Sequence, residues 1–217
     1  MKTVIISDVH LNHHFDEKKY LFLKELISSC DKIILNGDFW DGYRTTFDKF
    51  LASQWKQLFP LLIRKKALYL YGNHDQKRYG DKRVSLFSVE QKDNHEIAVN
   101  KMTYHIEHGH LLAHSIDIEY PFIPRSLLYV LNNVAQRFEY VFTHINSPHN
   151  VLLRHINSRT KKKLRAMKFP NWYLCGHTHY AEIDKKNKFA NSGFIQFGRA
   201  SYLIVDSSGL SLQIKKY

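Results

Sequence analysis

The chain has 217 residues, of which 44% are hydrophobic and 14% aromatic, and its net charge is +12. This apolar content excludes a disordered chain, and no run approaches the roughly 20 apolar residues of a membrane-spanning helix. Cys30 and Cys175 lack zinc-binding spacing, and we see no signal-peptide pattern, so we expect a cytoplasmic protein. The positive charge indicates an anionic partner: a phosphate ester, a nucleic acid or an acidic lipid surface.

The first half of the chain alternates between short apolar runs and amphipathic segments. Apolar runs at 3–7, 32–35 and 67–71 predict buried strands, and helical periods occur at 16–30 and 47–59. Strands and helices that alternate at this spacing predict βαβ units with a mainly parallel sheet, which is an α/β fold.

The second half has a different pattern. Alternating residues on either side of Asn100-Lys101 and of Ser207-Ser208-Gly209 predict two β-hairpins, and the run 172–175 predicts a further strand. There is no internal repeat and no low-complexity segment. We therefore expect a single domain over residues 1–217.

A basic amphipathic segment interrupts this second half. Apolar residues recur every three or four positions over 127–145, and Ser147-Pro148 has the pattern of a helix N-cap followed by proline. This predicts a helical hairpin inserted at 122–168, with its aromatic residues facing the core. Residues 121–170 contain nine Lys or Arg and a single acid, a net charge of +8. The insertion is where we expect the anionic partner to bind.

Five polar motifs lie at or just after the ends of predicted strands. Because such ends meet at one edge of an α/β sheet, we expect their side chains to converge. Extended backbone at these motifs would aim residues two apart in the same direction. Carboxylate, amide and imidazole ligands without a thiolate suit Mn²⁺, Fe²⁺, Zn²⁺ or Co²⁺ and argue against a structural zinc site. The motifs are Asp8-Val9-His10, Gly37-Asp38-Phe39-Trp40-Asp41, Gly72-Asn73-His74-Asp75, His108-Gly109-His110 and Gly176-His177-Thr178-His179.

Each motif also has a simpler interpretation. Alone, the Gly37-Asp38 motif is an ordinary strand-to-helix turn, and Asp41 and Asp75 are candidates for helix capping. With 14 histidines in the chain, a single one is more often a surface or core residue than a ligand. The order of all five motifs favours a joint site.

This order resembles the signature of the calcineurin-like metallophosphoesterases: Asp-x-His, Gly-Asp-x-x-Asp, Gly-Asn-His-Asp, His and Gly-His-x-His. The resemblance covers residues 8–179. It implies a four-layer α/β/β/α sandwich with a helical lid, and two divalent metal ions, manganese first and iron, zinc, cobalt or nickel as alternatives. A hydroxide between the ions would attack phosphorus in line. The implied ligand sets share Asp38: they are Asp8, His10, Asp38 and His179 for one ion, and Asp38, Asn73, His108 and His177 for the other.

The resemblance also implies roles for the remaining motif residues. His74 would act as a general acid, or as a donor to the leaving oxygen, and not as a metal ligand. Asp41 and Asp75 would orient histidines and loop amides. Arg44 and Arg78 follow the metal loops and would grip a second phosphate in a fork. The candidates for contact with substrate are Trp40, Tyr43, Arg44, Arg78, His110 and His144.

The superfamily does not fix the substrate. The basic insertion resembles the lid of the UDP-2,3-diacylglucosamine hydrolases, lipid A enzymes that cleave a pyrophosphate bond, although those commonly have Arg where this chain has His74. Our first hypothesis is hydrolysis of a small or lipid-linked phosphodiester or pyrophosphate, with the lid over the substrate or against the inner membrane surface. A nuclease acting on DNA or RNA is second. A non-catalytic scaffold is third, and the presence of every implied ligand argues against it.

Overall fold

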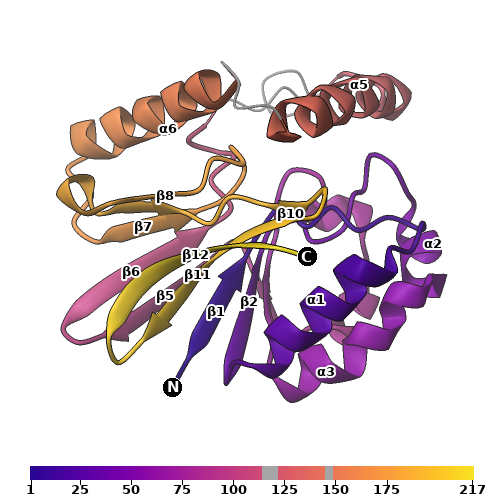
Figure 1. Cartoon of the computed structure of the whole chain (residues 1–217), viewed down its shortest axis with the longest axis horizontal. Coiled ribbons are helices and arrows are strands. Elements are labelled where there is room, and N and C mark those ends of the chain that lie inside the picture. Colours follow the sequence, from indigo (N-terminus) through magenta and orange to yellow (C-terminus); the bar gives the residue numbers. More distant parts are fainter. Residues whose placement is uncertain (114–121, 145–148) are drawn as a thin grey trace.

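The chain folds into two β-sheets that pack face to face, with helices on both outer faces (Figure 1). The computed structural model describes residues 1–113, 122–144 and 149–217. This layering confirms the α/β/β/α sandwich expected from the sequence.

The first sheet contains the parallel strands predicted for the first half of the chain. Within the described residues its order is β10-β11-β1-β2-β3-β4, and β12 pairs with β11. Thr3 lies opposite Lys32, and Ile34 lies opposite Leu68, in a parallel register, whereas β11 joins β1 in the antiparallel direction. The strands are β1 (Thr3–Ile6), β2 (Lys32–Asn36), β3 (Leu68–Leu70), β4 (Glu90–Lys92), β10 (Ile195–Gln196), β11 (Arg199–Asp206) and β12 (Gly209–Lys216).

The second sheet has the order β5-β6-β7-β9-β8 within the described residues. Both predicted hairpins form: β5 with β6, and β11 with β12. Asn100 and Lys101 at the first turn have φ values of 51° and 63°, as a tight hairpin turn requires. The strands are β5 (Asn94–Val99), β6 (Met102–Glu107), β7 (Trp172–Cys175), β8 (Glu182–Asp184) and β9 (Phe189–Asn191).

Alternate residues of the central strands face two different hydrophobic cores. Val4 and Ile6 belong to the core between the first sheet and α1 (Glu17–Ser28), whereas Ile5 belongs to the core between the sheets, with Ile106 and Leu174. Successive side chains of a strand point to opposite faces. A strand that is covered on both faces is therefore apolar throughout, which explains the continuous runs in the sequence.

The helix predicted over 47–59 is divided in the structure. Thr46 caps α2 (Phe47–Ala52), and the extended backbone of Ser53 ends it. A 3₁₀ segment, η1 (Gln54–Leu58), then leads to α3 (Phe59–Arg64), which has a proline in its first turn. Proline is tolerated there and would break a helix that continued through it. Short 3₁₀ turns also occur at η2 (Lys77–Tyr79), η3 (Lys82–Leu86) and η4 (Lys185–Asn187).

The insertion contains both predicted helices, α5 (Arg125–His144) and α6 (His149–Ala166), but they do not form a hairpin. They lie end to end along one side of the molecule (Figure 1), so the predicted antiparallel pairing is wrong. The periodicity that predicts each helix says nothing about which surface the helix packs on. Ser147-Pro148 lies outside the described residues. No helix in the described part of the chain combines the length and apolarity needed to cross a bilayer.

The two helices of the insertion contact different parts of the fold. Leu164 of α6 packs with Tyr173 and Phe189 on the outer face of the second sheet. α5 instead lies across the loops that follow β2, where its Asn132 and Gln136 reach Asp41. The helix α5 therefore borders the place where the polar motifs meet.

Candidate metal centre

The polar motifs predicted from the sequence come together where β1, β2, β3, β6 and β7 end. Side-chain atoms from all five loops lie within hydrogen-bond or ion-pair distance of a neighbour in the same cluster. The structure thus brings together all seven residues predicted as metal ligands: Asp8, His10, Asp38, Asn73, His108, His177 and His179.

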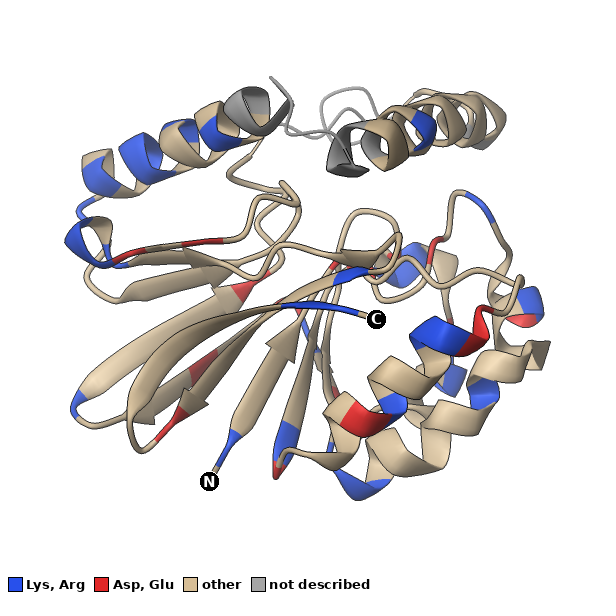
Figure 2. Cartoon of the chain, in the orientation of Figure 1, with Lys and Arg blue, Asp and Glu red and all other residues tan. Residues whose placement is uncertain are grey.

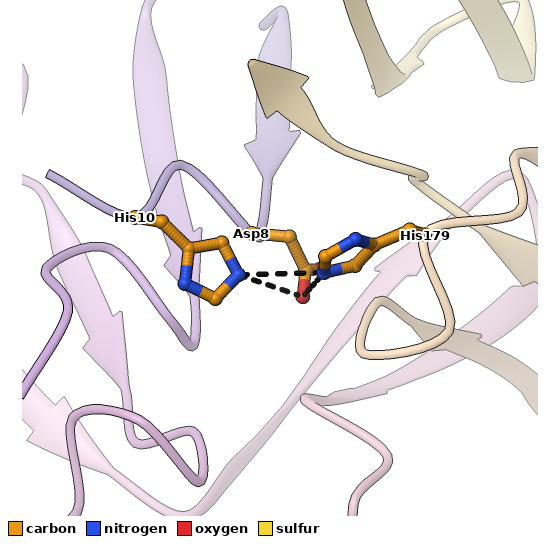
Figure 3. Close-up of side chains that lie close together, drawn as sticks. All are labelled: Asp8, His10 and His179. Carbon is orange, nitrogen blue, oxygen red and sulfur yellow. Dashed lines mark hydrogen bonds and ion pairs between the residues drawn. The ribbon is translucent and has the colours of Figure 1, made fainter. Parts of the chain in front are cut away.

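Asp8, His10 and His179 form one side of the cluster (Figure 3). His10 Nε2 lies 3.3 Å from His179 Nε2 and 3.9 Å from Asp8 Oδ1. His179 Nε2 lies 3.1 Å from the same oxygen of Asp8. Asp38 Oδ2 completes this group at 3.8 Å from His10 Nε2.

Asn73, His108 and His177 form the other side of the cluster. His108 Nε2 lies 3.1 Å from Asn73 Oδ1 and 3.3 Å from Asp38 Oδ2. His177 Nδ1 lies 2.9 Å from Asn73 Oδ1. The same oxygen of Asp38 therefore borders both groups.

The residues present fit divalent cations. The ring nitrogens of His10 and His179 face each other, an arrangement that a shared cation would satisfy with both as neutral ligands. Asp8 Oδ1 is buried and accepts no hydrogen bond from the described residues, although it lies next to His179. Buried polar atoms are usually paired. A cation would supply the missing partner.

The backbone of this cluster is left-handed at most of its turns. This conformation costs a non-glycine residue of order 1–2 kcal/mol and concentrates at functional sites. The expectation that extended backbone aims Asp8 with His10, and His177 with His179, is therefore wrong, because a local reversal at each residue aims them instead. The φ values are 53° for Asp8, 49° for His10, 52° for Asp38, 66° for His177 and 58° for His179.

Hydrogen bonds between loops hold these reversals in place. The amides of Val9 and His10 both donate to the carbonyl of Asp38, at 2.9 Å. Asp75 Oδ1 accepts from the amides of Asp38 at 2.9 Å and Gly72 at 2.7 Å, and its Oδ2 accepts from Phe39 at 2.7 Å. Asp75 thus connects the loops after β2 and β3.

Asp41 holds the side chain of His74, the residue predicted to act as the general acid. Asp41 Oδ1 lies 3.1 Å from His74 Nδ1 and also accepts from the amide of Tyr43, at 3.1 Å. The N-cap of the following helix is Thr46. Neither Asp41 nor Asp75 caps a helix among the described residues, so the capping alternative is wrong.

His108 and His74 both lie near Asp38 but differ in the partner of their Nδ1 atom. His108 Nδ1 donates to the carbonyl of Asn36 at 2.9 Å, which directs Nε2 at the cluster. His74 instead directs its Nδ1 at Asp41, and its Nε2 lies 3.9 Å from Asp38 Oδ2. His74 also lies close enough to His10 and Asp41 for these three side chains to form a further possible ligand group, so its role beside the metal ions stays a prediction.

Opposite charges determine how the cluster titrates. Burial by itself would raise the pKa of Asp8, but His179 and His108 outweigh it and lower that pKa to about 2. Burial would lower the pKa of His108, but the charges of Asp38 and Asp8 raise it to about 10. Burial would likewise lower the pKa of His74, but the charges of Asp38 and Asp41 raise it to about 9. The carboxylates are thus ionised at neutral pH, and a cation would compete with protons on the histidines.

The polar face of α5 was missed by the sequence reasoning. Asn132 Nδ2 and Gln136 Nε2 donate to Asp41 Oδ2 at 3.0 and 3.3 Å, and Arg44 Nη1 donates to Gln136 Oε1. The available signal was the spacing of four between Asn132 and Gln136, which places both amides on the helix face opposite the apolar stripe.

The residues predicted to contact substrate occupy different environments. Arg44 and Tyr43 border the cluster, and the Tyr43 ring lies 4.2 Å from that of His74. Arg78 is exposed and stacks on Tyr79, so the two arginines have different partners. His110 lies beside His108, with ring centroids 5.4 Å apart.

Two further predicted contacts have a different outcome. Trp40 is 1% exposed and packs on Phe47 and Phe50, so its assignment to the cleft wall is wrong. An aromatic residue next to a metal loop is equally suited to the core beneath that loop. The side chain of His144 is not among the described ones.

Comparison with known proteins identifies a family and a fold. The family model for calcineurin-like phosphoesterases matches residues 1–181. Comparison with curated proteins gives no match. Among solved structures, an archaeal phosphodiesterase is 15% identical with a TM-score of 0.51, and 99% of each chain is covered.

Two other solved structures are about as similar. The phosphoesterase Yfce of E. coli is 15% identical with a TM-score of 0.50, and 97% of this chain and 91% of that one are covered. A Thermotoga maritima protein is 17% identical with a TM-score of 0.50, covering 100% and 99%. At these identities the solved structures show the shared fold.

Replacing Asp75 by alanine should lower the free energy of unfolding by about 3 kcal/mol or more. Three buried amides would lose their acceptor, and each unsatisfied donor costs about 1–3 kcal/mol. Asp75→Asn should lower the free energy of unfolding less, because its side chain retains one carbonyl oxygen as an acceptor. Urea unfolding measures both, with the exposed Asp93→Ala as a control expected within about 0.5 kcal/mol of wild type. A loss in Asp75→Ala no larger than in the control would contradict this function of Asp75.

Proposed function

Because this chain belongs to the calcineurin-like phosphoesterases, we propose that it is a metal-dependent hydrolase that cleaves a phosphodiester or pyrophosphate bond at a dinuclear site. The position of Asp38 supports the proposal most strongly. One of its oxygens lies 3.8 Å from His10 Nε2 and 3.3 Å from His108 Nε2, so it borders both groups of ligand atoms. A carboxylate oxygen in this position can bridge two cations.

The two groups of ligand atoms would each hold one ion. When bound, two divalent ions would lower the pKa of water and neutralise negative charge on the phosphoryl group. The ligands would be Asp8, His10, Asp38 and His179 for one ion, and Asp38, Asn73, His108 and His177 for the other, with manganese as the first choice of metal.

His74 would protonate the leaving oxygen. Its side chain is 14% exposed, and Asp41 holds Nδ1 so that Nε2 is directed at the cluster. The neighbouring carboxylates raise the pKa of this imidazole to about 9, and bound cations would lower it towards neutrality. A group that is protonated near neutral pH and can release its proton is suited to general acid catalysis.

The exposed face of α5 supports a substrate with an apolar part. Its apolar residues recur at spacings of four and three, the pattern of a helix surface that binds another apolar surface. The expectation that the aromatic residues of the insertion face the core is wrong for Phe122, Phe138 and Tyr140, which are more than half exposed. The stripe consists of Leu127, Leu131, Val134, Phe138 and Val141, which are between 43% and 58% exposed.

The basic residues of α6 lie near the same side of the molecule (Figure 2). Lys161 is neutralised by Glu182 at 2.6 Å and Asp184 at 2.9 Å. An apolar helix face beside exposed cations is typical of helices that lie on anionic membranes. We therefore place a lipid-linked phosphoester first and a nucleic acid second, since a mainly aliphatic face suits acyl chains better than bases. The exposed cations of α6 and the segment after it are Arg154, Arg159, Lys162, Lys163, Arg165 and Lys168.

Variants of the proposed ligands should differ in how many metal ions they retain. Asp38→Asn should lose both ions and reduce manganese-dependent hydrolysis of bis-p-nitrophenyl phosphate at least about 100-fold, whereas His10→Gln should mainly lose one ion. His74→Gln should keep both ions and lower kcat by about 100-fold, within the range for general acid catalysis. Elemental analysis and initial rates measure these effects, with His95→Gln as a control outside the cluster. Wild-type hydrolysis by Asp38→Asn would contradict the proposal.

The double variant Leu131→Ser and Phe138→Ser should weaken binding to vesicles that contain phosphatidylglycerol, because burial of apolar area contributes about 25 cal/mol per Å². We expect at least a tenfold loss in a co-sedimentation assay. Leu86→Ser, which alters an exposed leucine away from α5, should bind like wild type. Equal binding by the double variant would remove the membrane proposal, and preferential binding of single-stranded DNA would favour the nuclease.

A further inference from the structure

A polar cavity of about 210 Å³ borders the proposed metal centre at His10. A second cavity, of about 230 Å³, borders it at His108 and includes Asp93 and Glu107 in its lining. The cavity at His108 thus has two acidic side chains in its lining, whereas the cavity at His10 has one acidic and two basic side chains. The cavity at His10 is lined mainly by groups that donate hydrogen bonds.

Two of these donors lack a partner. Gln196 is 5% exposed, and its Nε2 forms no hydrogen bond with the described residues. The buried hydroxyl of Tyr217 is likewise without a partner among them. A buried unsatisfied polar group costs about 1–3 kcal/mol, so a ligand with acceptor oxygens would relieve this cost at both positions.

Two basic side chains, Lys19 and Arg44, line the same cavity. Lys19 is 7% exposed, and burial lowers the pKa of its amine to about 7. Its Nζ donates one hydrogen bond to the carbonyl of Val9, and an anion bound beside it would favour the protonated form, which has two further protons to donate. Arg44 donates to Gln136 and has four further N–H groups. Asp16 is the single acidic side chain in the described lining, and its Oδ1 accepts from the amide of Lys19 as the N-cap of α1.

The turn between β10 and β11 places Gln196 in this wall. Phe197 and Gly198 have φ values of 56° and 74°, which a tight hairpin turn requires and which strain a phenylalanine. The Phe197 ring packs on Tyr140 of α5, with centroids 5.6 Å apart, and Gln136 of α5 lines the cavity too. The cavity is therefore closed on one side by the helix of the insertion.

We propose that this cavity binds a second phosphate group of the substrate, linked to the phosphate that is attacked at the metal centre. The proposal rests on the proposed function. Phosphate oxygens accept hydrogen bonds and carry negative charge, which matches two unpartnered donors and two basic side chains around one space. His10 is both in the wall of the cavity and in the cluster, so the two phosphates would lie in adjoining compartments.

This assignment changes the fork predicted from the sequence. In the proposed site Arg44 would bind the second phosphate together with Lys19 and not with Arg78, which is exposed and stacks on Tyr79 outside the cavity lining. A site with two adjoining phosphate compartments favours a diphosphate diester over a simple phosphodiester as substrate.

Calorimetric titration of the manganese-loaded protein tests this inference without requiring turnover. The probes are methylenediphosphonate, which has two linked phosphonates, and methylphosphonate, which has one. Lys19→Gln should weaken binding of methylenediphosphonate about tenfold, and Gln196→Leu and Tyr217→Phe about threefold to fivefold. Binding of methylphosphonate should change by less than about twofold. The matched control is Lys18→Gln, an exposed neighbour on α1, which should bind both probes like wild type.

Two outcomes would overturn the assignment. Equal weakening of both probes would mean that the cavity binds a single free phosphate, and unchanged binding of both would mean that it binds no phosphate. Tyr217→Phe removes one hydroxyl and keeps the aromatic ring, so it keeps the test valid if Lys19→Gln fails to fold. Failure of the manganese-loaded wild type to hydrolyse both bis-p-nitrophenyl phosphate and a diphosphate diester such as UDP-glucose would contradict the proposed function separately, since the calorimetric comparison does not depend on hydrolysis.

Discussion

Asp38 connects the fold to the proposed chemistry through its backbone and its side chain together. Its carbonyl accepts hydrogen bonds from Val9 and His10, which fixes the turn after β1. Its amide donates to Asp75, and its Oδ1 accepts from the amide of His74, which fixes the turn after β3. Its Oδ2 is then left facing both groups of ligand atoms. The positions of the surrounding side chains follow from these few hydrogen bonds.

Much of the fold and the membership of the cluster could be predicted from the sequence. Strands such as β2 are covered on both faces, so they appear as continuous apolar runs, and the motifs that follow them must meet at one edge. The backbone at the cluster could not be predicted in this way. The left-handed φ of Asp8 and His10 depends on amides that bind the carbonyl of Asp38, about 30 residues away, and a local pattern does not contain that contact.

The insertion was misjudged for a related reason. Periodicity predicts that α5 is amphipathic but not which of its faces is buried. Here the buried face carries Asn132 and Gln136, which donate to the buried carboxylate of Asp41, together with Leu128, whereas the apolar stripe is exposed. This inversion places the polar face of the helix against a charged centre and leaves its apolar face exposed. A substrate with linked phosphates at one end and acyl chains at the other would match both faces.

The shared position of Asp38 is tested most directly by anomalous diffraction from crystals of the protein soaked in manganese. We expect two anomalous peaks about 3.5–4 Å apart, the usual spacing of two-metal sites, with Asp38 Oδ2 between them. Asp8, His10 and His179 should surround one peak, and Asn73, His108 and His177 the other. A single peak, or two peaks of which one does not contact Asp38, would contradict this shared position.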